Sequence, residues 1–312
     1  MKRWFWLLLI FIVVALAAVY IAIPSTVVAT AAIKVQVADK SIIRIINNKS
    51  MQLWFAADSA TTENNNSFNY QGYQFALEKK NINAITINVQ KDDDAWQSEL
   101  LIIPTNVDAT LIKWNATLAE SINPFKKISA YIKAKKLEKT LEELTRNFAA
   151  YTSETANSYN IHIVQIHLKD SVLLAKKFET KGYPQADAVY NQITNLKTYI
   201  AANNARAEDY PMLHVTTTDS INYQCMVGVA INKTINENDE FKIKRMPYGG
   251  YMLTTKIVGG NNAIKQGFKN LESYIYDYNR RVPAIPFQLL VTDRSAVSDT
   301  SQWTTILYYP VE

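Results

Sequence analysis

The sequence contains few of the residues that bind metals or form disulfides. Among its 312 residues there is one cysteine, Cys225, and there are three histidines, His162, His167 and His214. A single cysteine cannot form an intrachain disulfide, and this set cannot supply the usual cysteine and histidine ligands of a zinc site. We therefore expect the protein to hold no metal and no other cofactor.

Motifs of well-known catalytic chemistry are missing as well. The sequence has no G-x-S-x-G, no P-loop and no H-E-x-x-H, which would indicate a serine hydrolase, a nucleotide-binding enzyme or a zinc protease. His162 and His167 are five residues apart, so on a strand they would lie on opposite faces. The acidic run at residues 92–94 lacks the spaced ligands of a calcium loop and indicates a hairpin tip. The sequence therefore favours a non-enzymatic protein.

The charge of the chain is weak and evenly spread. The formal net charge is +5 and the isoelectric point is about 9.0. The lysines are scattered rather than gathered on one stripe, so we expect no nucleic-acid partner. Hydrophobic residues make up 48% of the chain, which is enough to fill ordinary cores. A chain of this length predicts two domains.

One long hydrophobic run lies near the N-terminus. Residues 4–23, WFWLLLIFIVVALAAVYIAI, carry no charge, and a run of this length can span a bilayer core of about 30 Å. A cleaved signal peptide with a site near residues 15–17 is the alternative, but the run continues past that site, which favours an uncleaved anchor. Lys2 and Arg3 precede the run, so the positive-inside rule places the N-terminus in the cytoplasm and the soluble body in the periplasm or outside the cell. We expect a transmembrane anchor and tether over residues 1–32.

Residues 33–152 show the pattern of an antiparallel sheet followed by one long helix. Stretches such as AITINVQKD and ATLIKWNATLAE alternate apolar and polar residues, which is typical of strands with one buried face. From Pro124 the apolar residues recur at steps of mostly three and four, through Leu137 to Phe148, which predicts an amphipathic helix that covers a sheet. We expect a helix-grip domain here, followed by a linker at 153–160.

The second half of the chain contains an internal repeat with an offset of 75 residues. Between residues 188 and 211, eight of 24 positions are identical to those 75 residues later, and one such pair is Asn204 and Asn279. Each half has the order strand, helix, strand, strand, which predicts a pseudo-twofold domain over residues 160–312. The seam between the halves is a natural place for a pocket. The repeats run from about 170 to 232 and from 240 to 312.

Glycine is scarce, and half of the eight glycines lie between residues 246 and 263. Gly259 and Gly260 stand where a strand is expected to become a helix, which indicates a turn. Gly249 and Gly250 begin the same strand, where a β-bulge or a close approach of a ligand to the backbone would each explain them.

The second half contains a set of glycine, aromatic and proline motifs, which are Gly250-Tyr251, Gly259-Gly260, the helix FKNLESYIYDYN, Pro286-Phe287 and Tyr308-Tyr309-Pro310-Val311. With these motifs the chain resembles the GyrI-like (gyrase-inhibitor-like) effector-binding domain over roughly residues 160–312. The resemblance implies a small-molecule pocket. The family commonly carries an acidic residue on the proline-led strand that pairs with cationic ligands, and the matching residue here is Gln288. A neutral amide only hydrogen-bonds, so this departure argues against cationic ligands and against hydrolysis that uses the acid. Replacing Gln288 with Glu is expected to shift the preference toward cations.

The first half combines its order of elements with the stretch IKVQVADKSIIRIINN, the strand TLIKWNATL and the helix LEKTLEELTRNF. In these features it resembles the START-like polyketide cyclase/dehydrase superfamily (SRPBCC) over roughly residues 33–150. The resemblance implies a helix-grip fold with a deep apolar cavity, and we expect Trp54 and Trp114 to line it.

These patterns favour a membrane-tethered, non-enzymatic protein that senses or carries small amphipathic or lipid-like molecules. An envelope scaffold that binds other proteins is the first alternative, and a hydrolase or cyclase that uses Tyr274 with a carboxylate is the second. The expected fold class is α+β, with an N-terminal transmembrane helix, a helix-grip antiparallel-sheet domain and a pseudo-twofold duplicated βαββ domain. The residues expected to line the second pocket are Tyr248, Tyr251, Tyr274, Tyr278, Gln288 and Trp303.

Overall fold

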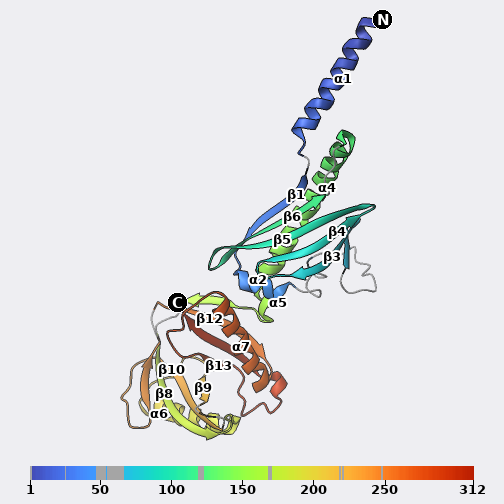
Figure 1. Ribbon diagram of the computed structural model, residues 1–312. Helices are drawn as coiled ribbons and strands as arrows, with labels where there is room; N and C mark the ends of the chain where they lie inside the picture. Colours follow the sequence, from blue (N-terminus) through green and yellow to red (C-terminus); the bar gives the residue numbers. More distant parts are fainter. Residues whose placement is uncertain are drawn as a thin grey trace. The chain divides into compact units, whose positions relative to one another are not determined.

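The chain divides into two compact units, Met1–Ser158 and Tyr159–Glu312, which are described separately (Figure 1). The computed structural model describes residues 2–24, 26–46, 54, 67–118, 123–167, 171–217, 219, 221–246 and 249–312.

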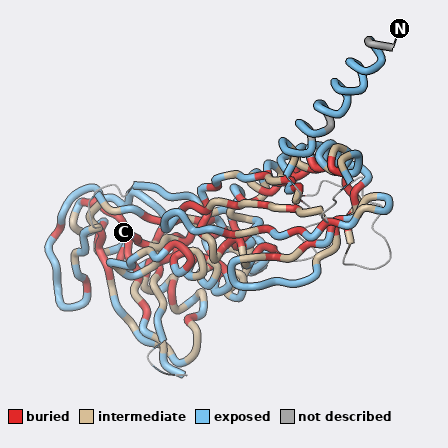
Figure 2. Tube along the Cα trace, turned by 45° about the horizontal axis from the view of Figure 1, so that its top comes forward, coloured by how far each residue is buried: buried red, intermediate tan, exposed pale blue. Residues whose placement is uncertain are grey.

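The chain begins with one long apolar helix. Helix α1 (Lys2–Ala22) has 21 residues, so it is about 32 Å long at 1.5 Å per residue. Its described side chains from Trp4 onward are exposed, as Figure 2 shows in pale blue. By length and composition this helix can cross a membrane.

The first unit contains a six-stranded antiparallel sheet in the order β1-β6-β5-β4-β3-β2. Its acidic hairpin tip is where the sequence predicts it, because Asp92 adopts a φ of 53° between β4 and β5 and aspartate tolerates this left-handed conformation in tight turns. The strands are β1 (Val27–Val35), β2 (Ser67–Tyr70), β3 (Tyr73–Lys80), β4 (Ala84–Lys91), β5 (Asp94–Asn106) and β6 (Ala109–Leu118). The helices are α2 (Asp39–Ile45), α4 (Pro124–Ser153) and α5 (Thr155–Tyr159), whose last residue is the first of the second unit.

Helix α4 begins where the sequence places its start. The side chain of Asn123 caps the helix by accepting from the backbone N–H groups of Phe125 and Lys126, at 2.9 and 3.3 Å. Pro124 occupies the first turn, where its missing N–H costs nothing. The buried stripe that runs from Leu137 to Phe148 packs in the core of the sheet. This sheet with one long covering helix is the helix-grip arrangement.

The second unit contains an eight-stranded antiparallel sheet and two helices on one face. The strand order is β11-β8-β10-β9-β13-β14-β12-β7. The strands are β7 (Val164–His167), β8 (Val172–Lys181), β9 (Met212–Thr217), β10 (Asn222–Ile231), β11 (Lys242–Arg245), β12 (Tyr251–Val258), β13 (Phe287–Leu290) and β14 (Thr304–Val311). The helices are α6 (Ala186–Ala202), α7 (Asn261–Asp277) and the short 3-10 helix η1 (Thr300–Gln302).

The duplicated βαββ order is confirmed. The elements β8-α6-β9-β10 are repeated as β12-α7-β13-β14, and β9 pairs with β13 at the seam, with Leu213 opposite Gln288. The identical pair Asn204 and Asn279 has a structural cause, since both adopt a positive φ, 53° and 48°. Each follows the C-terminus of its helix, where an asparagine in the left-handed region closes the last turn.

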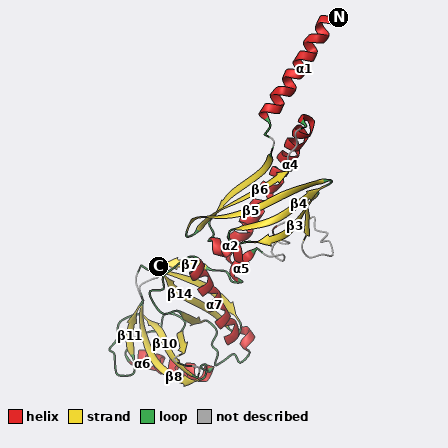
Figure 3. Cartoon of the chain, viewed as in Figure 1, coloured by secondary structure: helices red, strands yellow, loops and turns green. Residues whose placement is uncertain are grey.

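The sheet of the second unit is strongly curved. Strand β11 ends at Arg245 and β12 begins at Tyr251, and six residue steps reach at most about 22 Å. In a flat sheet the six spacings between these two strands would separate them by about 29 Å. The sheet must therefore bend, and Figure 3 shows its strands curving round.

Two glycines precede α7, the first required by its backbone conformation and the second by a close side chain. Gly259 has a φ of 133°, and a Cβ at Gly260 would lie 3.1 Å from Thr300. The turn predicted at this junction is present. Gly249, at a φ of 78°, lies in the turn that leads into β12.

Candidate functional site

The two faces of the second sheet carry different side chains. Successive residues of a strand point to opposite faces, and on β10 the residues Cys225, Val227 and Val229 pack in the core with α6. Met226 and Gly228 therefore face the other way, on the side of the sheet that α6 does not cover. Each face has its own cavities.

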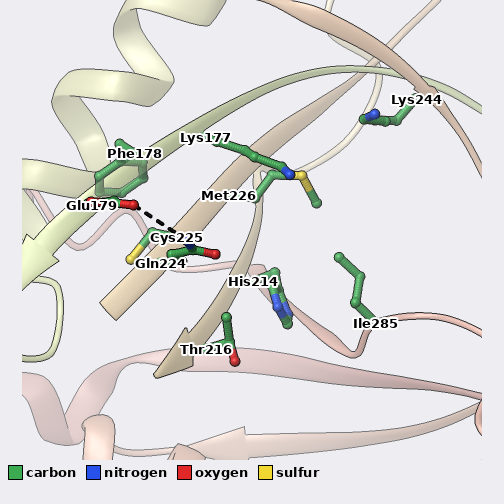
Figure 4. Close-up of a pocket in the computed structure, with 10 residues that line it drawn as sticks. All are labelled: Lys177, Phe178, Glu179, His214, Thr216, Gln224, Cys225, Met226, Lys244 and Ile285. Atoms are coloured by element: carbon green, nitrogen blue, oxygen red, sulfur yellow. Dashed lines mark hydrogen bonds between the residues drawn. The ribbon is translucent and has the colours of Figure 1, made fainter. Parts of the chain in front are cut away.

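A groove follows the face that the helices leave open. Its larger part, about 580 Å³, is lined by residues from β8, β9, β10 and β11, and Figure 4 shows them with the hydrogen bond between Gln224 and Glu179. Its smaller part, about 180 Å³, shares four lining residues with the larger one, so the two parts are continuous. The shared residues are His214, Met226, Lys244 and Ile285.

Methionines gather in the smaller part, and we call the whole groove the methionine groove. Met212 on β9, Met226 on β10, Met246 after β11 and Met252 on β12 all line it. These are four of the six methionines in the chain, and they come from both repeats. Methionine is unbranched and polarizable, so such a surface adapts its shape to apolar ligands.

The methionine groove has more cationic than acidic lining residues. Lys177, Lys244 and Arg245 line it and are exposed, whereas Glu179 is the acidic residue among its lining residues. Within the groove, Nδ1 of His214 lies 2.6 Å from the carbonyl oxygen of Pro286. A carbonyl can only accept, so Nδ1 carries the proton and Nε2 remains available to a ligand.

On the helix side of the sheet, Gln288 lies at the seam in contact with a buried arginine. Gln288 is 1% exposed and Arg294 is 7% exposed. Nη2 of Arg294 donates to Oε1 of Gln288 at 3.0 Å and to Oγ1 of Thr305 at 2.9 Å. The guanidinium also lies 4.8 Å from the ring of Trp303. A neutral amide at position 288 thus faces a cation, where a carboxylate would form an ion pair.

Two tyrosines complete this side of the seam. The hydroxyl of Tyr183 accepts from Nε2 of Gln288 at 3.5 Å, and Tyr190 donates to the carbonyl of Thr292 at 2.9 Å. Burial raises the pKa of both phenols and lowers the pKa of Arg294. Tyr183 lines two cavities of about 340 Å³ each, one of which includes Arg294 and the other Gln288.

The other aromatic residues expected in the second pocket lie elsewhere. Tyr274 and Tyr278 stack on each other at 4.2 Å, and Tyr159 packs edge-on against Tyr274 at 5.3 Å. Tyr159 donates to the buried carboxylate of Asp277 at 3.0 Å, so an acid does lie beside these rings. This aromatic cluster is separate from Gln288 and Trp303.

Tyr251 does not extend the seam. Tyr251 is 42% exposed on β12 and lies 4.2 Å from the ring of His167 on β7. Tyr248 lies outside the residues that the structure describes.

In the first unit, the two tryptophans lie in the core. Trp54 packs against Trp114 at 6.3 Å and Phe148 at 4.9 Å, and Nε1 of Trp114 donates to Oγ of Ser98 at 2.6 Å. A cavity of about 550 Å³ in this unit is lined by Trp96 and its neighbours and includes neither of the two. Both rings therefore pack against other aromatic side chains in the core.

Sequence reasoning missed the residues that define the site most clearly. Arg294 lies in the segment VTDRSAVSD, whose polar composition indicates only a loop. The methionines of the groove are spread over 41 positions, from Met212 to Met252. On the strands, the methionines alternate with core residues, which indicates that they lie on the face away from the core. This pattern does not show which strands become neighbours.

Comparison with known proteins gives distant structural likeness. No family model matches the chain, and no curated protein matches it. The crystal structure of the EcmrR C-terminal domain is 13% identical and covers 49% of this chain and 98% of its own, with a TM-score of 0.43. The structure of SAV2435 bound to tetraphenylphosphonium is 16% identical and covers 49% and 94%, with a TM-score of 0.33. A START superfamily protein from Mycobacterium smegmatis is 14% identical and covers 40% and 97%, with a TM-score of 0.29.

Proposed function

We propose that this protein is a membrane-tethered, non-enzymatic binder of a small amphipathic molecule, which it senses or carries. The methionine groove would take the apolar part of the ligand. The observation that carries the proposal is that three strands and the residue that follows β11, from both repeats, bring four methionines to one groove.

The groove has the size and lining of a ligand site. Its larger part, about 580 Å³, has the volume of a cleft that binds a small molecule. The smaller part adds about 180 Å³. Phe287 and Pro310 add apolar walls to the methionines, and burying apolar surface there is favourable by about 25 cal/mol per Å². The cationic rim suits an anionic head group, because Lys177 and Lys244 would lie close to it.

Helix α1 would hold this binding unit at a membrane. Lys2 and Arg3 precede the apolar run, which favours a cytoplasmic N-terminus and a body on the other side of the membrane. In this arrangement the protein would meet amphipathic molecules that partition at the membrane surface.

The proposal is tested with palmitate as the probe. The full chain is purified in detergent micelles, mixed with palmitate or with hexadecyltrimethylammonium, and examined by native mass spectrometry. We expect a retained palmitate adduct and a weaker adduct with the cation of equal chain length. Absence of both adducts would refute small-ligand binding in the groove and favour the scaffold alternative.

A pair of variants locates the adduct. Met226→Glu places a carboxylate in the groove at a half-buried position, and we expect it to abolish palmitate retention. Val258→Glu adds the same charge at an exposed position on β12 and should retain palmitate as the wild type does. Equal retention by both variants would show that palmitate binds elsewhere.

A further inference from the structure

Arg294 is a buried cation without an anionic partner among the described residues. Its side chain uses the two N–H groups of Nη2 for Gln288 and Thr305, both neutral. Nε is buried and has no hydrogen-bond partner, and no ion pair joins Arg294 to a described carboxylate. Asp293, next to it in sequence, bonds Ser295 instead. Burying a charge is costly unless it is paired.

Arg294 lines a cavity of about 340 Å³ on the helix side of the seam, which we call the arginine cavity. Two helix N-termini open onto it, through Ala186 of α6 and Asn261 of α7. Neither helix has a side-chain cap, so the first N–H groups of each have no such acceptor, and the helix dipoles add positive potential. The carboxylate among the lining residues, Asp187, is exposed.

One part of the wall of the arginine cavity is aromatic and apolar, and the rest is polar, with Ser298 and Thr300 among its residues. Tyr183, Tyr190 and Trp303 line it together with Val189 and Leu213. The flat ring of a ligand packs well against aromatic side chains, with about 4.5–7 Å between the ring centroids. One buried cation, two helix N-termini and three aromatic residues thus lie around one space.

We propose that the arginine cavity binds a small aromatic carboxylate, with its carboxylate held by Arg294 and its ring against the tyrosines and Trp303. The carboxylate supplies the missing counter-charge. This site is on the opposite face of the sheet from the methionine groove. The result of the palmitate experiment therefore neither supports nor refutes it.

The position of Gln288 explains why an external anion is needed. A glutamate at position 288 would lie about 3.0 Å from Nη2 of Arg294, as Oε1 of Gln288 does now, and would neutralise the guanidinium inside the protein. The structure thus changes the expected effect of Gln288→Glu. The new carboxylate would pair with Arg294 rather than attract a cationic ligand.

The test uses benzoate as the probe and isothermal titration calorimetry on the full chain in detergent micelles. We expect benzoate to bind the wild type and benzamide, its neutral counterpart, to bind at least tenfold more weakly. Acetate should also bind more weakly than benzoate, since it has no ring. Failure of benzoate to bind at millimolar concentration, or equal binding of benzamide, would overturn the proposal.

Three variants assign the site. Arg294→Met should weaken benzoate binding at least tenfold, whereas Lys269→Met removes the same charge from α7 outside the arginine cavity and should leave it unchanged. Gln288→Glu keeps Arg294 in place and should also weaken benzoate binding at least tenfold while the melting temperature stays at or above that of the wild type. This variant decides the question if Arg294→Met does not fold. Wild-type benzoate affinity in Gln288→Glu would overturn the proposal.

Discussion

Placing a larger side chain at Gly228, in the methionine groove, should raise the stability of the protein and weaken its binding of palmitate. Gly228 is on β10 and lines the apolar part of the groove. A Cβ built there would lie 3.9 Å from the carbonyl oxygen of Leu174 and 4.0 Å from Cβ of Ala175, which are ordinary contact distances. Its φ is outside the left-handed region, so Gly228→Leu can be accommodated and would extend into the groove.

The expected change in stability is a gain. Burying a leucine side chain stabilises by about 1.5–3 kcal/mol, and fixing its rotamer costs about 0.5–1 kcal/mol. Replacing glycine also reduces the freedom of the unfolded chain, which contributes about 0.4–1 kcal/mol. We therefore expect Gly228→Leu to raise the free energy of unfolding by about 1–3 kcal/mol. Palmitate affinity should fall at least tenfold, or by about 1.4 kcal/mol, because the leucine occupies the ligand's space.

The assay can use the single thiol of the chain. Cys225 is 2% exposed, and burial raises the pKa of its thiol, so it should react with a thiol reagent mainly after the second unit unfolds. Labelling over a urea series then gives the free energy of unfolding, and native mass spectrometry gives palmitate retention. Gly228→Ala is the matched control, since it adds only Cβ and should keep palmitate bound. Palmitate retention by Gly228→Leu, or easier unfolding of this variant than of the wild type, would contradict the prediction.

Three further predictions concern single polar contacts. Tyr159→Phe removes the donor to the buried carboxylate of Asp277 and should lower the free energy of unfolding by about 1.5–3 kcal/mol, measured by the same thiol labelling; a loss below about 0.5 kcal/mol would contradict this. Trp114→Phe removes the buried bond to Ser98 and should destabilise the first unit by about 1–3 kcal/mol, seen as a lower midpoint in circular dichroism, whereas an unchanged midpoint would count against it. Asp299 has a lowered pKa because Ser301 donates to its carboxylate, so its contribution to the turn at η1 is present above the unfolded pKa near 4 and is lost as the pH falls through the lower folded value. A carboxyl NMR titration that matches a free aspartate would contradict the last prediction.

In the first unit the sequence predicted the elements better than the cavity. The helix that begins at Pro124 follows from a local cap and a repeating apolar stripe, and both depend on residues within a few turns of each other. The placement of Trp54 and Trp114 depends on packing across the sheet. Their rings meet Phe148 and Phe75 in the core.

In the second unit the repeat predicted the topology. An offset of 75 residues relates Asn204 to Asn279 because both helices end in the same left-handed turn, which is a local requirement. The same repeat indicated a seam between the halves, and β9 and β13 do pair there. The apolar pattern and the offset of 75 residues were sufficient to predict the order of the elements, because each βαββ half has the same local order.

The sequence by itself determined the apolar N-terminal helix, the α+β class and the duplication, because these follow from length, period and local caps. Only the tertiary structure decided what surrounds Gln288. Arg294 is six residues further along the chain, and the loop between β13 and β14 folds back to place its guanidinium 3.0 Å from the amide oxygen. Electrostatic interactions depend on distance and burial in space. A neutral residue in the sequence therefore became part of a cationic site in the folded protein.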